Sequence, residues 1–171
     1  MTTEITIKAM TDDADLANWH HYTESGLSNY WLSEHLFLSE IIDGEEYISY
    51  PQFENIHAAI GINLCELQRG LGPREIKFLR KELSLTQLAL GKKFGLADDQ
   101  IVSRAESLSK ERHSPLSKSN DALLRIFYLK SLFLDNEAVS DYLKKAASDL
   151  FARLDADLTF DFIETQNMLV A

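Results

Sequence analysis

Residues Leu83–Glu106, LSLTQLALGKKFGLADDQIVSRAE, hold the pattern that decides the fold. Thr86 is suited to cap a helix, and Gly91 in the middle of that helix allows a neighbouring element to pack closely. Gly95 ends the helix, because glycine enters the left-handed conformation freely. The stretch therefore predicts two short helices joined by a tight turn.

The second helix of this pair is expected to follow the two acidic residues Asp98 and Asp99, which are suited to cap it. Its apolar residues predict the buried side: Ile101, Val102 and Ala105. Its polar residues are expected to face outward: Gln100, Ser103 and Arg104. In a helix-turn-helix, this outward face enters the major groove of DNA. Two helices joined by glycine also occur in all-α proteins that bind no DNA.

The same stretch resembles the Cro/repressor-type (Xre) helix-turn-helix family, most closely the DNA-binding half of MqsA-type antitoxins. The resemblance covers about residues 72–130, through LSLTQ (Leu83–Gln87), FG (Phe94-Gly95), SRxE (Ser103–Glu106) and LLR (Leu123–Arg125). It implies a lambda-repressor-like helical bundle. It departs from the family in a turn about one residue longer after Gly95, and in Ala105 where an aromatic residue is common. MqsA-type proteins bind zinc through cysteine pairs, and a chain with one cysteine cannot do so.

The distribution of charge is an independent argument for DNA. The chain has 17 Lys+Arg and 27 Asp+Glu, a net charge of −10. Between Arg69 and Lys130 there are 13 basic and 7 acidic residues, a net of +6, whereas the remainder carries 4 basic and 20 acidic residues. The segment with the helix-turn-helix pattern is thus also the basic segment, as a phosphate-binding surface requires.

Composition and simple motifs argue against several other classes of protein. A length of 171 residues allows one or two domains. Cys65 has no partner for an internal disulfide, and the N-terminus lacks the features of a signal peptide. No apolar run approaches the length of a membrane span. We therefore expect a cytoplasmic protein without a membrane partner. The five histidines form no metal-binding pattern, and no glycine-rich phosphate loop occurs. We therefore expect no enzyme activity and no cofactor. His57 and Cys65 are interpreted as core residues.

Outside the central stretch, the sequence predicts a small α+β segment and further helices. TEITIKA (residues 3–9) and the run Tyr30–Ile42 have the composition of strands, and Asp43-Gly44 predicts a hairpin with the strand after it. Pro51 and Pro73 are placed to begin helices, the first running to about Leu67. Ser119 or Asn120 is expected to cap a later helix, and Asn136 another, to about Asp155. The tail LTFDFIE (residues 158–164) alternates like a strand.

Candidate DNA contacts follow from these assignments. Arg104 and Gln100 are expected to read bases, since arginine binds guanine and glutamine binds adenine bidentately. Ser103 would contact a base or a phosphate, and Asp99 caps the helix unless it reads cytosine. In the family pattern Gln87 touches a phosphate, with Thr86 and nearby amides assisting. Simple capping by Gln87, and a surface ion pair of Arg104 with Glu106 or Asp99, are the alternatives. Further basic side chains that could reach the DNA backbone are Lys77, Arg80, Lys81, Lys110, Arg112 and His113.

Together these features predict a mainly α, overall α+β protein with three segments: 1–68 (acidic, α+β), 69–134 (helix-turn-helix) and 135–171 (helix and tail). The expected function is sequence-specific DNA binding as a dimeric repressor that reads a two-fold operator. The apolar stripe of residues 136–155 is a candidate dimer surface or simply core. Two alternatives stay open. One is an antitoxin that masks a basic toxin with residues 1–68, which hold 12 acidic residues and 1 basic residue. The other is a protein-interaction module that binds no DNA.

Overall fold

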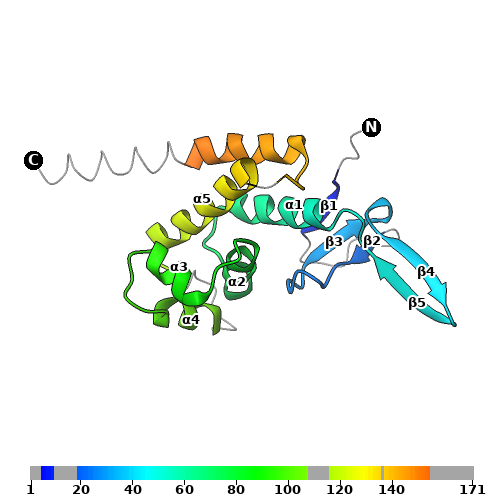
Figure 1. Ribbon diagram of the computed structural model, residues 1–171, viewed down its shortest axis with the longest axis horizontal. Coiled ribbons are helices and arrows are strands. Elements are labelled where there is room, and N and C mark those ends of the chain that lie inside the picture. Colours follow the sequence, from blue (N-terminus) through cyan, green and yellow to red (C-terminus); the bar gives the residue numbers. More distant parts are fainter. Residues whose placement is uncertain (1–4, 10–18, 108–115, 136, 155–171) are drawn as a thin grey trace, which may run out of the picture.

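The computed structural model describes residues 5–9, 19–107, 116–135 and 137–154, and shows an α+β fold. The strands are β1 (Ile7–Ala9), β2 (Trp19–His21), β3 (Tyr30–Ser33), β4 (Leu38–Ile42) and β5 (Glu45–Ser49), with a 3-10 turn, η1, at Glu34–Leu36. The helices are α1 (Phe53–Glu66), α2 (Pro73–Glu82), α3 (Gln87–Lys93), α4 (Gln100–Ser107), α5 (Lys118–Asp135) and residues 141–154. Figure 1 shows the strands at one end, α3 and α4 at the other, and α1 and α5 between them.

The N-terminal strands form a three-stranded antiparallel sheet in the order β1-β3-β2. Alternate residues of β3, Tyr30 and Leu32, are buried, as expected for a strand with one face on the core. The strand expected over Tyr30–Ile42 is interrupted, because η1 turns the chain and places Leu36 in the core at 0% exposure. Only the beginning and the end of that run are extended.

The predicted hairpin is confirmed. β4 and β5 pair antiparallel with Ile42 opposite Glu45. The turn residues Asp43 and Gly44 have φ of 53° and 85°, the left-handed pair that a two-residue hairpin of the type I′ class requires. This two-stranded sheet projects away from the rest of the molecule (Figure 1).

Helix α1 forms the centre of the core and carries two residues that the sequence assigned to it. His57 is 6% exposed and Cys65 is 1% exposed, so both predictions are confirmed. The His57 ring donates through Nδ1 to Glu82 at 2.8 Å, and its Nε2 lies 2.8 Å from the hydroxyl of Tyr22. These two bonds connect α1 to α2 and to the chain after β2. Burial raises the pKa of the Cys65 thiol, which keeps it protonated.

Helix α5 begins at Lys118, earlier than either predicted cap would allow. Ser117, rather than Ser119 or Asn120, is the cap, since its hydroxyl accepts the Asn120 amide at 3.2 Å. This start places Asp121 in the first turn, where its carboxylate accepts the Leu71 amide at 2.7 Å. The position of the cap is therefore fixed by a contact with a segment 50 residues earlier.

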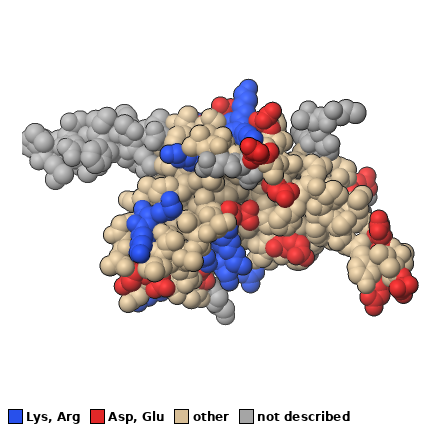
Figure 2. Space-filling view, in the orientation of Figure 1, with Lys and Arg blue, Asp and Glu red and all other residues tan. Residues whose placement is uncertain are grey.

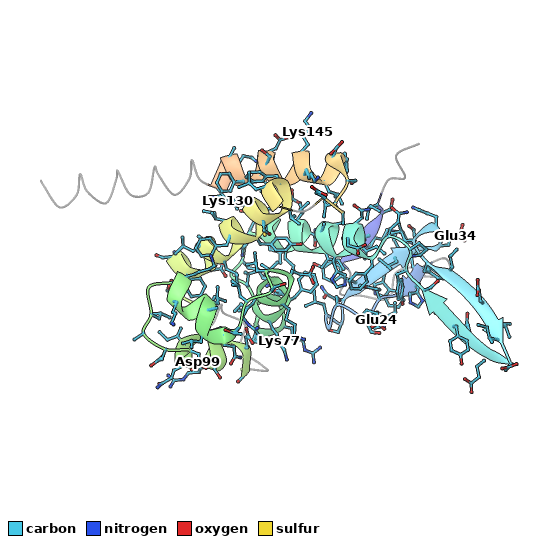
Figure 3. All side chains as sticks on the ribbon, viewed as in Figure 1. Glu24, Glu34, Lys77, Asp99, Lys130 and Lys145 are labelled. Atoms are coloured by element: carbon cyan, nitrogen blue, oxygen red, sulfur yellow. The ribbon has the colours of Figure 1, made fainter. Side chains whose placement is uncertain are left out.

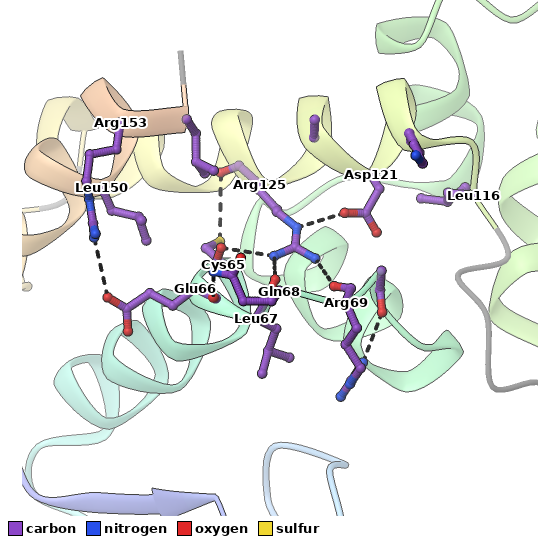
Figure 4. Close-up of a pocket in the computed structure, with 14 residues that line it drawn as sticks. Cys65, Glu66, Leu67, Gln68, Arg69, Leu116, Asp121, Arg125, Leu150 and Arg153 are labelled. Carbon is purple, nitrogen blue, oxygen red and sulfur yellow. Dashed lines mark hydrogen bonds and ion pairs between the residues drawn. The ribbon is translucent and has the colours of Figure 1, made fainter. Parts of the chain in front are cut away.

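A buried arginine joins α5 to the end of α1 (Figure 4). The Arg125 side chain is 7% exposed and its Nε donates to Asp121 at 2.7 Å. Its two terminal nitrogens donate to the carbonyl oxygens of Leu64 (3.2 Å), Cys65 (2.9 Å), Leu67 (2.8 Å) and Arg69 (2.7 Å). Arg125 thereby binds carbonyl groups in the last turn of α1 and in the segment that follows the helix.

The C-terminal helix covers residues 141–154, so the predicted start at Asn136 is wrong, although Asn136 itself lies outside the described residues. The amide of Ser140, just before the helix, donates to Asn55 at 2.8 Å, which fixes the start against α1. Of the predicted apolar stripe, Val139, Leu143 and Leu150 are at most 5% exposed. That face belongs to the core of the same chain, and is not available as a dimer surface.

One buried core runs from Tyr22 to Leu150 and draws on all three segments expected from the sequence. The tail LTFDFIE and most of the predicted loop at residues 110–119 lie outside the described residues. None of the helices described here is long and apolar enough to cross a membrane.

We predict that Arg125→Met lowers the free energy of unfolding by about 3–5 kcal/mol, because it leaves Asp121 buried without its cation. Arg125→Lys should be less destabilising than Arg125→Met but still less stable than the wild type, since an ammonium group cannot contact both the Asp121 carboxylate and the four carbonyl oxygens. Urea denaturation followed by circular dichroism measures both. A loss below about 1 kcal/mol for Arg125→Met would show that the hydrogen bonds of Arg125 contribute little to stability.

Candidate nucleic-acid interface

The first helix of the predicted pair is α3, and both of its expected ends are confirmed. The Thr86 hydroxyl accepts the Ala89 amide at 3.1 Å, which caps the start of the helix. Gly95 has φ of 77°, in the left-handed region, and its amide donates to the Lys92 carbonyl at 3.0 Å. These local signals are sufficient to stop the helix after two turns and to aim the chain toward α4.

The turn between α3 and α4 is closed by a tight backbone contact. A Cβ at Gly91 would overlap the carbonyl oxygen of Asp98, so the close packing predicted for this glycine is confirmed. The Asp98 carboxylate accepts the Gln100 amide at 3.0 Å, and the Asp99 carbonyl accepts the Ser103 amide at 2.8 Å. Both aspartates thus lie at the start of α4, as expected.

The buried side of α4 consists of Val102 and Ala105, which are 0% and 1% exposed. Ile101 was predicted to belong to this side and does not, since it is 43% exposed. Val102 and Ala105, one turn apart, define the line of contact with the other helices, and Ile101 lies about 100° around the helix from Val102.

An internal ion pair fixes α4 against α2. Glu106 accepts from the Arg80 guanidinium at 2.5 and 2.8 Å and from the Gln87 side-chain amide at 2.9 Å. Arg80 also donates to the Leu85 carbonyl at 2.7 Å. The side chains of Arg80 and Glu106 are only 11% and 4% exposed, and their hydrogen bonds raise the pKa of Arg80. One carboxylate therefore connects α2, α3 and α4.

These contacts differ from what the sequence predicted for Arg80 and Gln87. Arg80 was predicted to be one of the basic side chains that could reach a phosphate, but its guanidinium is bound by Glu106. Gln87 was expected to touch a phosphate or to act as a cap, whereas its side-chain amide donates to Glu106. Neither contact is visible in the local sequence, because the partners are 26 and 19 residues apart.

The outward face of α4 contains the residues expected there. Gln100 and Arg104 are exposed, Ser103 is half-buried, and the Ser107 hydroxyl donates to the Ser103 carbonyl at 2.7 Å. The alternative ion pair of Arg104 is absent from the described residues, since Glu106 is occupied by Arg80. Asp99 is exposed at the edge of the same face. Lys110, Arg112 and His113 lie outside the described residues, so their proposed backbone contacts stay predictions.

Charges are unevenly distributed over the molecular surface (Figure 2). Lysine and arginine side chains lie on the helical part together with acidic ones, whereas the projecting hairpin at the right of the view shows only acidic charge. The hairpin contributes Glu40, Asp43, Glu45 and Glu46. The hairpin therefore repels a polyanion more strongly than the helical part does.

A hollow of about 860 Å³ lies between the end of α1, the start of α5 and the C-terminal helix (Figure 4). Its polar groups are largely engaged: Arg125 is bound as described, and Arg153 lies 3.6 Å from Glu66. No group of three or more histidine, cysteine or carboxylate side chains suited to hold a metal occurs in the described part of the chain.

Comparison with protein-family models, with curated proteins and with solved structures gives no match for this chain.

We predict that Glu106→Ala lowers the free energy of unfolding by about 3 kcal/mol, because it leaves Arg80 buried without a counter-charge. Gln87→Ala should cost only about 1 kcal/mol, the value of one hydrogen bond. Thermal and urea unfolding measure both changes.

The control is the double variant Arg80→Met/Glu106→Leu, which replaces both charges with apolar groups of similar size. It should be more stable than Glu106→Ala, because no unpaired charge remains. If the double variant loses as much stability as the single variants Arg80→Met and Glu106→Leu lose when their losses are added, the two residues are not a coupled pair.

Proposed function

We propose that the protein is a sequence-specific DNA-binding regulator of the lambda-repressor-like helix-turn-helix class, in which α4 enters the major groove. The observation that carries this proposal is the contrast between the two sides of α4. Its inner side is fixed to α2 and α3 through Glu106, whereas Gln100 and Arg104 stay exposed. A rigidly held helix with exposed bidentate side chains is what base recognition requires.

The net charge of +6 between Arg69 and Lys130 supports this function, since phosphate neutralisation supplies a large share of the affinity for DNA. Ser103, Asp99 and Thr86 lie on or beside the same two helices and complete the proposed contact set. We propose further that the regulator is a dimeric repressor, because helix-turn-helix proteins of this class read two half-sites about one helical turn apart.

We predict that the purified protein binds the DNA upstream of its own gene, with an affinity that falls steeply as salt increases. Arg104→Ala should lose about 1–3 kcal/mol of preference for that sequence over unrelated DNA. Fluorescence anisotropy across a salt series measures both. Arg153→Ala, which removes an arginine whose side chain is 67% exposed on the C-terminal helix, is the matched control and should retain the preference. Failure to bind any duplex at low salt would overturn the proposed function.

A second candidate function is protein binding through the β4–β5 hairpin, as in an antitoxin that holds a basic toxin. The hairpin exposes large apolar side chains: Leu38 (54%), Ile41 (78%), Ile42 (50%) and Tyr47 (51%). Its outer edges have no neighbouring strand among the described residues. Exposed apolar edges of this kind favour pairing with another chain, and four acidic residues favour a basic partner.

For this second function we predict that a strand-forming peptide of alternating lysine and valine perturbs the amide resonances of β4 and β5 in NMR spectra, whereas its glutamate counterpart does not. Glu40→Lys/Glu46→Lys, which leaves two acidic and two basic residues on the hairpin, should abolish that preference. Asp141→Lys/Asp149→Lys, with the same change in net charge on the C-terminal helix, should not. Equal effects of the two double variants, or perturbations outside the hairpin, would contradict protein binding at this surface.

A further inference from the structure

Helix α2 carries three basic residues on one exposed face. Arg74, Lys77 and Lys81 are separated by three and four residues, which places them along one side of a helix. All three are exposed, whereas Ile76 and Leu79 on the opposite side are buried. Because each helical residue rises about 1.5 Å, the three cations extend along roughly 10 Å. We name Arg74, Lys77 and Lys81 the α2 basic stripe.

Within the described part of the chain, the three residues of the α2 basic stripe form no ion pair, whereas most of the arginines do. The arginines that are paired with carboxylates are Arg69, Arg80, Arg125 and Arg153. Those pairs join segments of the same chain, so their charges are already neutralised. Among the described residues, the charges of the α2 basic stripe are not neutralised in this way.

The α2 basic stripe lies beside a small hollow and on the same edge of the molecule as the start of α4. Lys77 and Asp99 both lie along the lower edge in Figure 3, whereas Lys130 and Lys145 lie in the upper part. The hollow, of about 290 Å³, is bordered by all three cations and by Glu24 and Glu82. Glu82 accepts a hydrogen bond from His57 and remains an anion, so Glu24 and Glu82 are both acidic neighbours that oppose a bound anion.

We infer that the α2 basic stripe binds phosphates of duplex DNA beside the base pairs that α4 reads, and so extends the contact along the backbone. The inference rests on the proposed function, since it takes the position of DNA from α4. Successive phosphates of one strand rise by about 3.4 Å along the duplex axis and also wind around it, so a row of cations roughly 10 Å long reaches at most about three of them. Arg74, Lys77 and Lys81 match that length and sign of charge.

The test compares Lys77→Gln/Lys81→Gln with Lys130→Gln/Lys145→Gln, which removes two exposed lysines on the opposite part of the molecule. Each variant is titrated against the tightest-binding duplex selected from a random-sequence library, from low to high salt. In the stripe variant, the slope of log K against log salt should become shallower by about 2, and affinity should fall equally for all sequences. The control variant should keep the wild-type slope.

A second measurement uses the same duplex shortened stepwise at its ends. The wild-type protein should lose affinity when the flanking base pairs are removed, whereas the stripe variant should be insensitive to their removal. Glu24→Gln, which removes one of the two opposing charges, should tighten binding and leave the preferred sequence unchanged. This increase in affinity is a result that damage to the fold would not produce.

An unchanged salt slope in the stripe variant, or an equal change in the control variant, would overturn the inference. Either result would leave the proposed function intact as long as the wild-type protein binds and Arg104→Ala loses its sequence preference. Absence of wild-type binding to every duplex would instead overturn both.

Discussion

The ion pair between Glu106 and Arg80 is the interaction on which the geometry of the helical end depends. Both side chains are almost fully buried, and Glu106 also accepts from Gln87, so one carboxylate sets the positions of α2, α3 and α4. Each of these helices is too short to be stable alone, since isolated helices below about 12 residues are marginal in water. Their arrangement is therefore a property of this contact and of the core beneath it.

Basic residues in this chain divide into two groups with different consequences. Arg125 and Arg80 are buried, and their hydrogen bonds go to carbonyl groups and carboxylates of the same chain. Arg104 and Lys77 are exposed and have no ion pair among the described residues. The first group holds the fold together, and the second is available to an anionic partner. The proposed DNA-binding function depends on this division, because net charge alone does not distinguish the two groups.

Much of the fold could be predicted where local signals are strong. The cap at Thr86, the left-handed Gly95 and the Asp43-Gly44 turn all depend on the conformations of single residues, which sequence reveals directly. Long-range contacts were not predictable in this way. The hydrogen bond from Gln87 to Glu106, for example, joins residues that are far apart in the chain. At the candidate site, helical periodicity correctly predicted that Gln100 and Arg104 face outward. It wrongly predicted that Ile101 is buried, because the buried face of α4 is narrower than the number of its apolar residues indicates.

The measurement that tests the central claim most directly is a thermodynamic cycle between Arg104 and a guanine in the selected duplex. Each guanine is replaced in turn by 7-deazaguanine, which lacks the N7 acceptor, and binding is measured for the wild-type protein and for Arg104→Ala. If Arg104 reads a base from α4, one replacement will weaken the wild type and leave the variant unaffected, with a coupling of about 1–3 kcal/mol. Strictly additive losses at every guanine would contradict base recognition by Arg104.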